Sequence, residues 1–89
     1  MIGTASRDSL PEARATGVVS VETGKHHRRH RHVGYAGSDG ARITVTDYPA
    51  AEDQKRVTIW TPDGRRREVR ERGSVRWALA VAGYRLEDD

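Results

Sequence analysis

The chain has 89 residues, of which 35% are hydrophobic and 33% charged, and its formal net charge is +3 at pH 7. A chain of this length forms one domain with a thin core, because it buries only about 60% of its unfolded surface. The absence of cysteine excludes disulfides and thiolate zinc sites, and no run approaches the ~20 apolar residues of a membrane span or the apolar stretch of a secretory signal.

Residues 1–16 mix small, polar and charged residues without an apolar period, and they predict an extended N-terminal arm. Such an arm has no apolar face to order it alone, so we expect a partner to hold it. A single β-rich domain is predicted over residues 17–89. Its first strand is "VVSVE", with Val19 and Val21 on one face, and "TGK" follows as a turn.

Two further strands follow from strict alternation. In "ARITVTDY", Ile43 and Val45 point to one face, while Arg42, Thr44 and Thr46 point to the other. "GSDG" before it predicts a turn. In "RVTIWT", Val57, Ile59 and Thr61 share one face and Trp60 lies on the opposite one.

The stretch "TPDGR" predicts a hairpin turn. Pro62 and Asp63 suit the central positions of a type I turn, and Gly64 suits the left-handed residue that follows. The hairpin closes onto "RRREVRE". Ser74 is then the expected N-cap of a helix over "VRWALAVA", which Gly83 ends.

These segments predict a mainly β domain of the α+β class. We expect a small antiparallel sheet or barrel-like meander of four or five strands, an extended N-terminal arm and one short C-terminal helix. The hairpin and helix form a module over residues 57–86. That helix is apolar on nearly all sides, so it is either buried between layers or pressed against another chain. Trp60 lies on the strand face away from Val57 and Ile59, and we expect it to contact a partner chain or a second copy together with Trp77 and Tyr84.

The stretch "KHHRRHRH" holds all four histidines. A metal site is one interpretation, since His30 and His32 share a face of a strand and His26 and His30 share a face of a helix. Interleaved positive charges would repel a dication, so we expect no bound metal and no cofactor. A solvated edge strand is the second interpretation.

The third interpretation is contact with a polyanion, because guanidinium groups bind phosphates and carboxylates in a bidentate fashion. A second arginine cluster surrounds the predicted hairpin turn and consists of Arg65, Arg66, Arg67, Arg70 and Arg72. The predicted contact residues are Lys25, Arg28, Arg29, Arg31, Arg65, Arg66, Arg67 and Arg70. Two such clusters in one small domain favour an acidic partner.

No enzymatic motif is present. The chain has no Gly-x-Ser-x-Gly sequence, no phosphate-binding loop and no paired-carboxylate arrangement, so we expect a binding protein and not an enzyme. Nucleic acid remains an alternative partner, in which case the protein would be a regulator or genome-associated protein of the cytoplasm. Known reader motifs are absent from the sequence, and acidic residues are numerous.

The stretch "VTIWTPDGRRREVRERGSVRWALAVAGYRLEDD" resembles a short module of small virion proteins from tailed phages of high-GC bacteria. Both have a strand, a Pro-Asp-Gly turn, a second strand, a short helix, and then glycine before an aromatic and an aliphatic residue. The second strand of those modules is usually acidic, whereas here it is basic. The resemblance implies a minor capsid, decoration or head-completion protein that stabilises the phage head, with the major capsid protein as its partner and the virion as its location.

Overall fold

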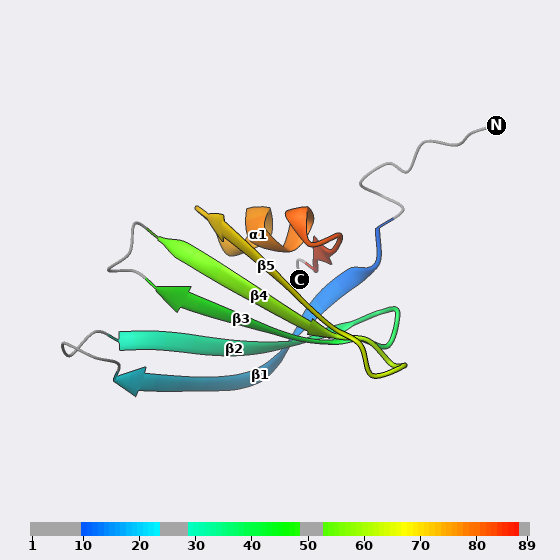
Figure 1. Ribbon diagram of the computed structural model, residues 1–89, viewed down its shortest axis with the longest axis horizontal. Coiled ribbons are helices and arrows are strands. Elements are labelled where there is room, and N and C mark those ends of the chain that lie inside the picture. The colour runs from blue at the N-terminus through cyan, green and yellow to red at the C-terminus, as the bar shows by residue number, and fades with distance from the viewer. Residues whose placement is uncertain (1–9, 24–28, 49–52, 88–89) are drawn as a thin grey trace.

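Six strands and one short helix make up the described part of the chain. The computed structural model describes residues 10–23, 29–48 and 53–87, without the side chains of residues 18–20, 22–23 and 29. The elements are β1 (Glu12–Thr23), β2 (Arg29–Gly37), β3 (Arg42–Tyr48), β4 (Gln54–Trp60), β5 (Arg66–Arg72), α1 (Val75–Val81) and β6 (Arg85–Leu86). One sheet holds all six strands in the order β5-β4-β3-β2-β1-β6 (Figure 1). β1 to β5 form an antiparallel meander, and β6 pairs parallel with β1.

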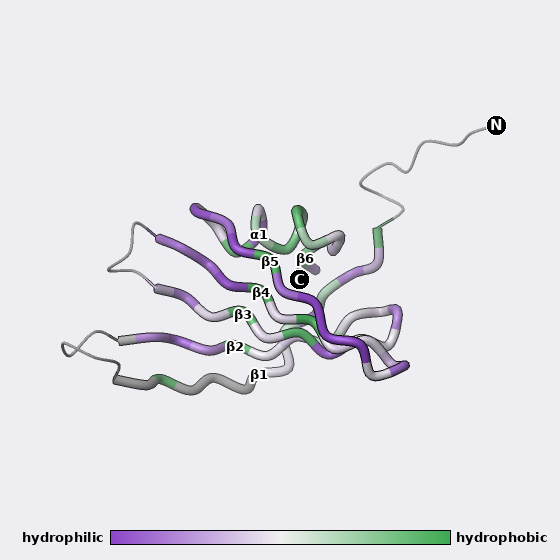
Figure 2. Tube along the Cα trace, viewed as in Figure 1, coloured by the Kyte–Doolittle hydropathy of each residue, from purple (hydrophilic) through white to green (hydrophobic). Residues whose placement is uncertain are grey.

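The core lies between one face of the sheet and α1. Alternating residues of β3 and β4 point to this face, as their sequences predict, and Val45 pairs with Val57 while Ile43 pairs with Ile59. The largest core side chains from the sheet are Tyr35, Ile43, Val45, Val57 and Ile59, and α1 and its C-cap add Ala78, Leu79 and Ala82. Figure 2 shows that hydrophobic positions of β3 and β4 gather beside α1, whereas β5 is mostly hydrophilic.

The helix α1 joins the two edges of the sheet. It contacts β4, β5 and β6, and β5 and β6 are the two edge strands. The sheet must therefore curl until both edges reach the same helix, which gives a half-barrel. This curl places α1 on the inner side of the sheet. None of the other described elements packs on the outer side.

Both ends of α1 are capped by side chains. The Ser74 hydroxyl, at the predicted N-cap, accepts a hydrogen bond from the Trp77 amide at 3.1 Å. At the other end, the Arg67 guanidinium of β5 donates to the Ala82 carbonyl at 2.7 Å. Gly83 then turns the chain with a φ of 94°, a conformation that glycine adopts without strain.

The segment after the helix ties distant parts of the chain together. The Tyr84 hydroxyl donates to Asp39 Oδ2 at 2.7 Å in the turn between β2 and β3. The Arg85 amide donates to the Pro11 carbonyl at 2.9 Å, and the Arg85 side chain forms an ion pair with Glu12. These contacts explain how a strand of only two residues joins the sheet.

A row of alternating charges crosses the inner side of the sheet beyond the valines. Arg31, Asp47, Lys55 and Glu71 are successive register partners on β2 to β5. Lys55 is only 6% exposed, and its ammonium group lies 3.1 Å from Asp47 Oδ1 and donates to the Asp53 carbonyl at 3.0 Å. Opposite charges at cross-strand positions stabilise this register.

The mainly β class, the hairpin and the short helix agree with the sequence-based predictions. The sheet has six strands instead of four or five, because Arg85 and Leu86 pair with β1 over a length too short for any periodic pattern. The predicted arm over residues 1–16 is too long: β1 begins at Glu12, and Ala13 is fully buried opposite Gly37. Residues 1–9 and the predicted turn at Gly24 lie outside the described residues.

Replacing Arg67 with Ala should lower the free energy of unfolding by about 1 to 2 kcal/mol, because the last turn of α1 loses a hydrogen bond from a charged donor. Arg66→Ala is the control, since it removes the same charge from an exposed ion pair with Glu68. Its expected effect is below about 0.5 kcal/mol. Urea unfolding followed by circular dichroism measures both variants, and equal losses would contradict a capping role for Arg67.

Tyr84 should make stability depend on pH in the alkaline range. Burial, and then the hydrogen bond to Asp39, raise the pKa of Tyr84 from its ordinary value of 10.0 to about 12. Because the folded state holds this proton more tightly, the stabilisation is complete below pH 10.0 and is lost as the pH rises through about 12. Tyr84→Phe should flatten the fall of the unfolding free energy over this window. An unchanged slope in that variant would show that other groups cause the fall.

Candidate functional site

The outer side of the sheet carries a concentrated positive charge. The residues between the core positions of β3, β4 and β5 point to this side, and five of them are arginines. These are Arg42, Arg56, Arg66, Arg70 and Arg72, which we call the arginine face. All except Arg56 are exposed, and Arg56 is half-buried. The neighbouring strand β2 adds His30 and His32 on the same side.

Acidic side chains of these four strands lie mostly on the other side. Asp47 and Glu71 belong to the charge row on the inner side of the sheet. Among the described side chains of β2 to β5, Glu68 is the only carboxylate on the outer side. It forms ion pairs with Arg66 at 3.2 Å and Arg70 at 3.0 Å. The outer side therefore keeps a large excess of positive charge, although the whole chain carries only +3.

Glu68 is held in its charged form. Its hydrogen bond from Arg70, together with the charges of Arg70, Arg56 and Arg66, lowers the pKa of Glu68 below its usual value. The carboxylate thus stays anionic at any pH near neutrality. Its two arginine neighbours are partly neutralised, whereas the Arg42 guanidinium forms no ion pair or hydrogen bond within the described residues.

The arginine face is closely packed at its centre. Tyr48 contacts His30 edge to face, with ring centroids 4.5 Å apart, and the Arg56 guanidinium lies 5.6 Å from the Tyr48 ring centroid. His32 Nδ1 lies 2.9 Å from Thr46 Oγ1, and Thr46 is only 2% exposed although it points outward. Of the arginine face, these contacts hold Arg56 in place beside Tyr48.

Trp60 occupies one end of the arginine face, between two arginines. Its register partners are Arg42 on β3 and Arg66 on β5, so the three side chains form one row across the outer side. Trp60 is 36% exposed, whereas its neighbour Ile59 is fully buried on the other side. The row presents an aromatic side chain with a cation on each flank.

Only part of the predicted contact set lies together. Arg66 and Arg70 belong to the arginine face, and Trp60 lies among them. Arg65 lies in the hairpin turn, where it forms an ion pair with Asp63 at 3.4 Å. Lys25 and Arg28 fall outside the described residues, and the Arg29 side chain does as well.

Three predicted contacts have another position. Arg31 is exposed but lies on the inner side, opposite Asp47, and thus faces away from His30 and His32. Arg67 also points inward, and its guanidinium donates a hydrogen bond to the Ala82 carbonyl at the end of α1. Tyr84 is 3% exposed and belongs to the core, so it does not offer the exposed partner surface that the sequence predicted.

The sequence interpretation missed Arg42 and Arg56, and it grouped Arg72 with the hairpin arginines without naming it as a contact. Arg42 was correctly predicted to point to the face of β3 away from Ile43, but a single arginine in a strand gave no reason to select it as a contact residue. The signal was in the register: these residues become neighbours only when β3, β4 and β5 are aligned. No three His, Cys, Asp or Glu side chains are grouped as metal ligands in the described residues, and His26 and His27 lie outside them.

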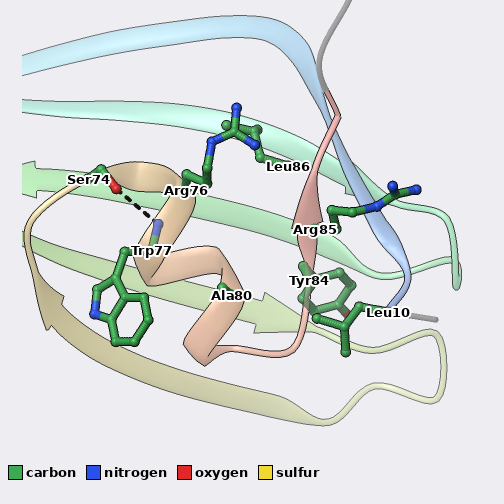
Figure 3. Close-up of a pocket in the computed structure, with 8 residues that line it drawn as sticks. All are labelled: Leu10, Ser74, Arg76, Trp77, Ala80, Tyr84, Arg85 and Leu86. Carbon is green, nitrogen blue, oxygen red and sulfur yellow. Dashed lines mark hydrogen bonds between the residues drawn. The ribbon is translucent and has the colours of Figure 1, made fainter. Parts of the chain in front are cut away.

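A second surface feature is a groove between α1 and β6 (Figure 3). Its volume is about 400 Å³, and its lining residues are Leu10, Ser74, Arg76, Trp77, Ala80, Tyr84, Arg85 and Leu86. Trp77 is 49% exposed, and its indole N–H donates to Glu71 at 3.0 Å. Val81 on the same helix is 44% exposed. The helix thus keeps part of its apolar surface uncovered, as its sequence predicted.

The chain matches no protein-family model, no curated protein and no solved structure. No helix among the described residues is long and apolar enough to cross a membrane. The function must therefore be inferred from the two surfaces themselves.

Proposed function

We propose that this chain is a non-enzymatic nucleic-acid-binding protein that holds a phosphate backbone against its arginine face. The observation that carries the proposal is the separation of charge: five arginines and one carboxylate on the outer side of β3 to β5, with Asp47 and Glu71 on the inner side. A basic surface of this kind is the electrostatic footprint of a nucleic-acid contact.

The geometry suits a backbone contact. Guanidinium groups donate to two phosphate oxygens at once, and arginine keeps its charge at all physiological pH values. Positions on neighbouring strands are about 4.8 Å apart, and same-face positions along a strand are about 6.8 Å apart. The five arginines thus form a two-dimensional array that can meet several phosphates without a conformational change. Such an array recognises the charge and spacing of the phosphates and does not discriminate between base sequences.

Arg42→Ala should weaken the binding of a short DNA oligonucleotide about fivefold, and should lower the slope of log affinity against log salt by about 0.7 to 0.9. Arg31→Ala is the matched control, because it removes the same charge from an exposed position on the inner side. It should leave the affinity within about twofold of the parent. Fluorescence anisotropy at several salt concentrations measures both quantities.

Glu68→Gln provides the opposite change. It removes the negative charge from the arginine face, so affinity and salt slope should both rise. Binding that does not depend on salt, or an equal loss in the Arg42 and Arg31 variants, would contradict a contact through the arginine face.

A structural role in a phage particle is the second candidate function. The uncovered surface of α1 favours it, since Trp77 and Val81 are 49% and 44% exposed and Trp77 lines a largely apolar groove. An exposed tryptophan beside such a groove is typical of a protein–protein contact. The resemblance of the hairpin and helix to phage head proteins points to the same partner class, with the major capsid protein as the expected contact.

A head component should co-purify at fixed stoichiometry with phage particles through a density gradient. Trp77→Ala should reduce its incorporation, because the variant removes the exposed indole of α1, whereas Trp60→Ala on the arginine face should not. Mass spectrometry of the gradient fractions measures incorporation. Absence of the chain from purified particles would rule out this second function.

A further inference from the structure

Trp60 remains partly exposed on the side of the sheet opposite the core. It is the last residue of β4 and points away from the core, where Ile59 and Val57 already fill the inner side of that strand. Of the large hydrophobic side chains that are exposed in the described residues, Trp60 is the one on the arginine face. Its indole can stack on a ligand that has a flat apolar surface of its own.

The two residues that flank Trp60 are cations, so they favour a ligand with negative charges. Arg42 and Arg66 are the direct cross-strand neighbours of Trp60, and such neighbours have Cβ atoms about 5 Å apart. Arg42 has no partner within the described residues, and Arg66 shares Glu68 with Arg70. The row therefore offers one cation on each side of a single aromatic ring. This matches a flat group linked to anions on both sides.

The strand ends that carry the row are joined by two turns that pack against each other. In the β4–β5 turn, the Thr61 amide donates to the Arg65 carbonyl at 2.9 Å and the Gly64 amide to the Thr61 carbonyl at 3.0 Å. The β2–β3 turn packs against this one, because a Cβ on Gly40 would lie only 3.0 Å from Pro62 Cγ. Both turns thus fix the strand ends that carry the three side chains. The backbone that carries the three side chains is therefore preorganised for binding.

We propose that the arginine face binds single-stranded nucleic acid, with one base stacked on Trp60 and the adjacent phosphates bound by Arg42 and Arg66. This inference rests on the proposed nucleic-acid-binding function and names the form of nucleic acid. A duplex hides its base faces within the stack, so it can use the arginines but not the indole. A single strand can use both, and stacking on an aromatic side chain tolerates any base.

The test compares a single-stranded oligonucleotide with the duplex of the same sequence and with poly-glutamate. In a Trp77→Phe background, Trp60 is the only tryptophan, so its fluorescence reports directly on the contact. Saturation with the single strand should quench this fluorescence, and the duplex should bind at least tenfold more weakly at the same salt concentration. Poly-glutamate should bind more weakly than either.

Two variants separate stacking from charge. Trp60→Ala should weaken single-strand binding about tenfold or more, with an unchanged salt slope, because no charge is removed. Trp60→Phe should retain most of the affinity, which shows that the ring and not the fold is responsible; urea unfolding of both variants checks the fold. Equal affinity for single strand and duplex, with no effect of Trp60→Ala, would overturn this inference while leaving the proposed function intact. Absence of binding to either nucleic acid would overturn both, and tighter binding of poly-glutamate would assign the face to an acidic protein.

Discussion

The contact of one short helix with both edges of the sheet determines the rest of the structure. Because α1 contacts both β5 and β6, the sheet must curl around the helix. The inner side of the sheet is then covered by the helix, whereas the outer side is not. The inner side receives the valine and isoleucine pairs that the helix covers. The outer side receives every residue between them and no covering element in the described chain. The Arg67 bond to the Ala82 carbonyl and the Tyr84 bond to Asp39 hold the helix and its following segment in that position.

Because the sheet has two different sides, the low net charge of the whole chain understates the positive charge of the outer side. A sum of +3 over the whole chain suggests a weak electrostatic partner. The folded chain, however, turns Asp47 and Glu71 inward, toward Lys55 and Trp77, and leaves the five residues of the arginine face outside. A ligand near the outer side therefore meets a charge density that the overall composition does not report. Glu68 moderates this density without removing it, since it is shared between two arginines.

Local patterns in the sequence were sufficient for the strands β3 and β4, the Pro62–Gly64 turn and the helix with its Ser74 cap, since each depends on neighbouring residues alone. The remainder depends on residues far apart in the chain. β6 exists because Arg85 meets Pro11 and Glu12. The arginine face exists because three strands align, and Arg31 and Arg67 lie off it because strand alternation turns them inward. A count of arginines within one stretch cannot separate the two sides of a strand, so the sequence grouped Arg31 and Arg67 with arginines that lie on the opposite side of the sheet.

The position of α1 in the chain also sets the order in which the protein can complete itself during synthesis. The helix and β6 leave the ribosome after all five strands of the meander, so Ile43, Val45, Val57 and Ile59 have no cover while those strands first pair. Neighbouring strands can form hairpins early, because each connection closes a short loop. The link between Glu12 and Arg85 closes the longest loop and must come last. Until then the nascent sheet exposes a strip of aliphatic side chains, so the risk of aggregation is greatest at this stage of synthesis.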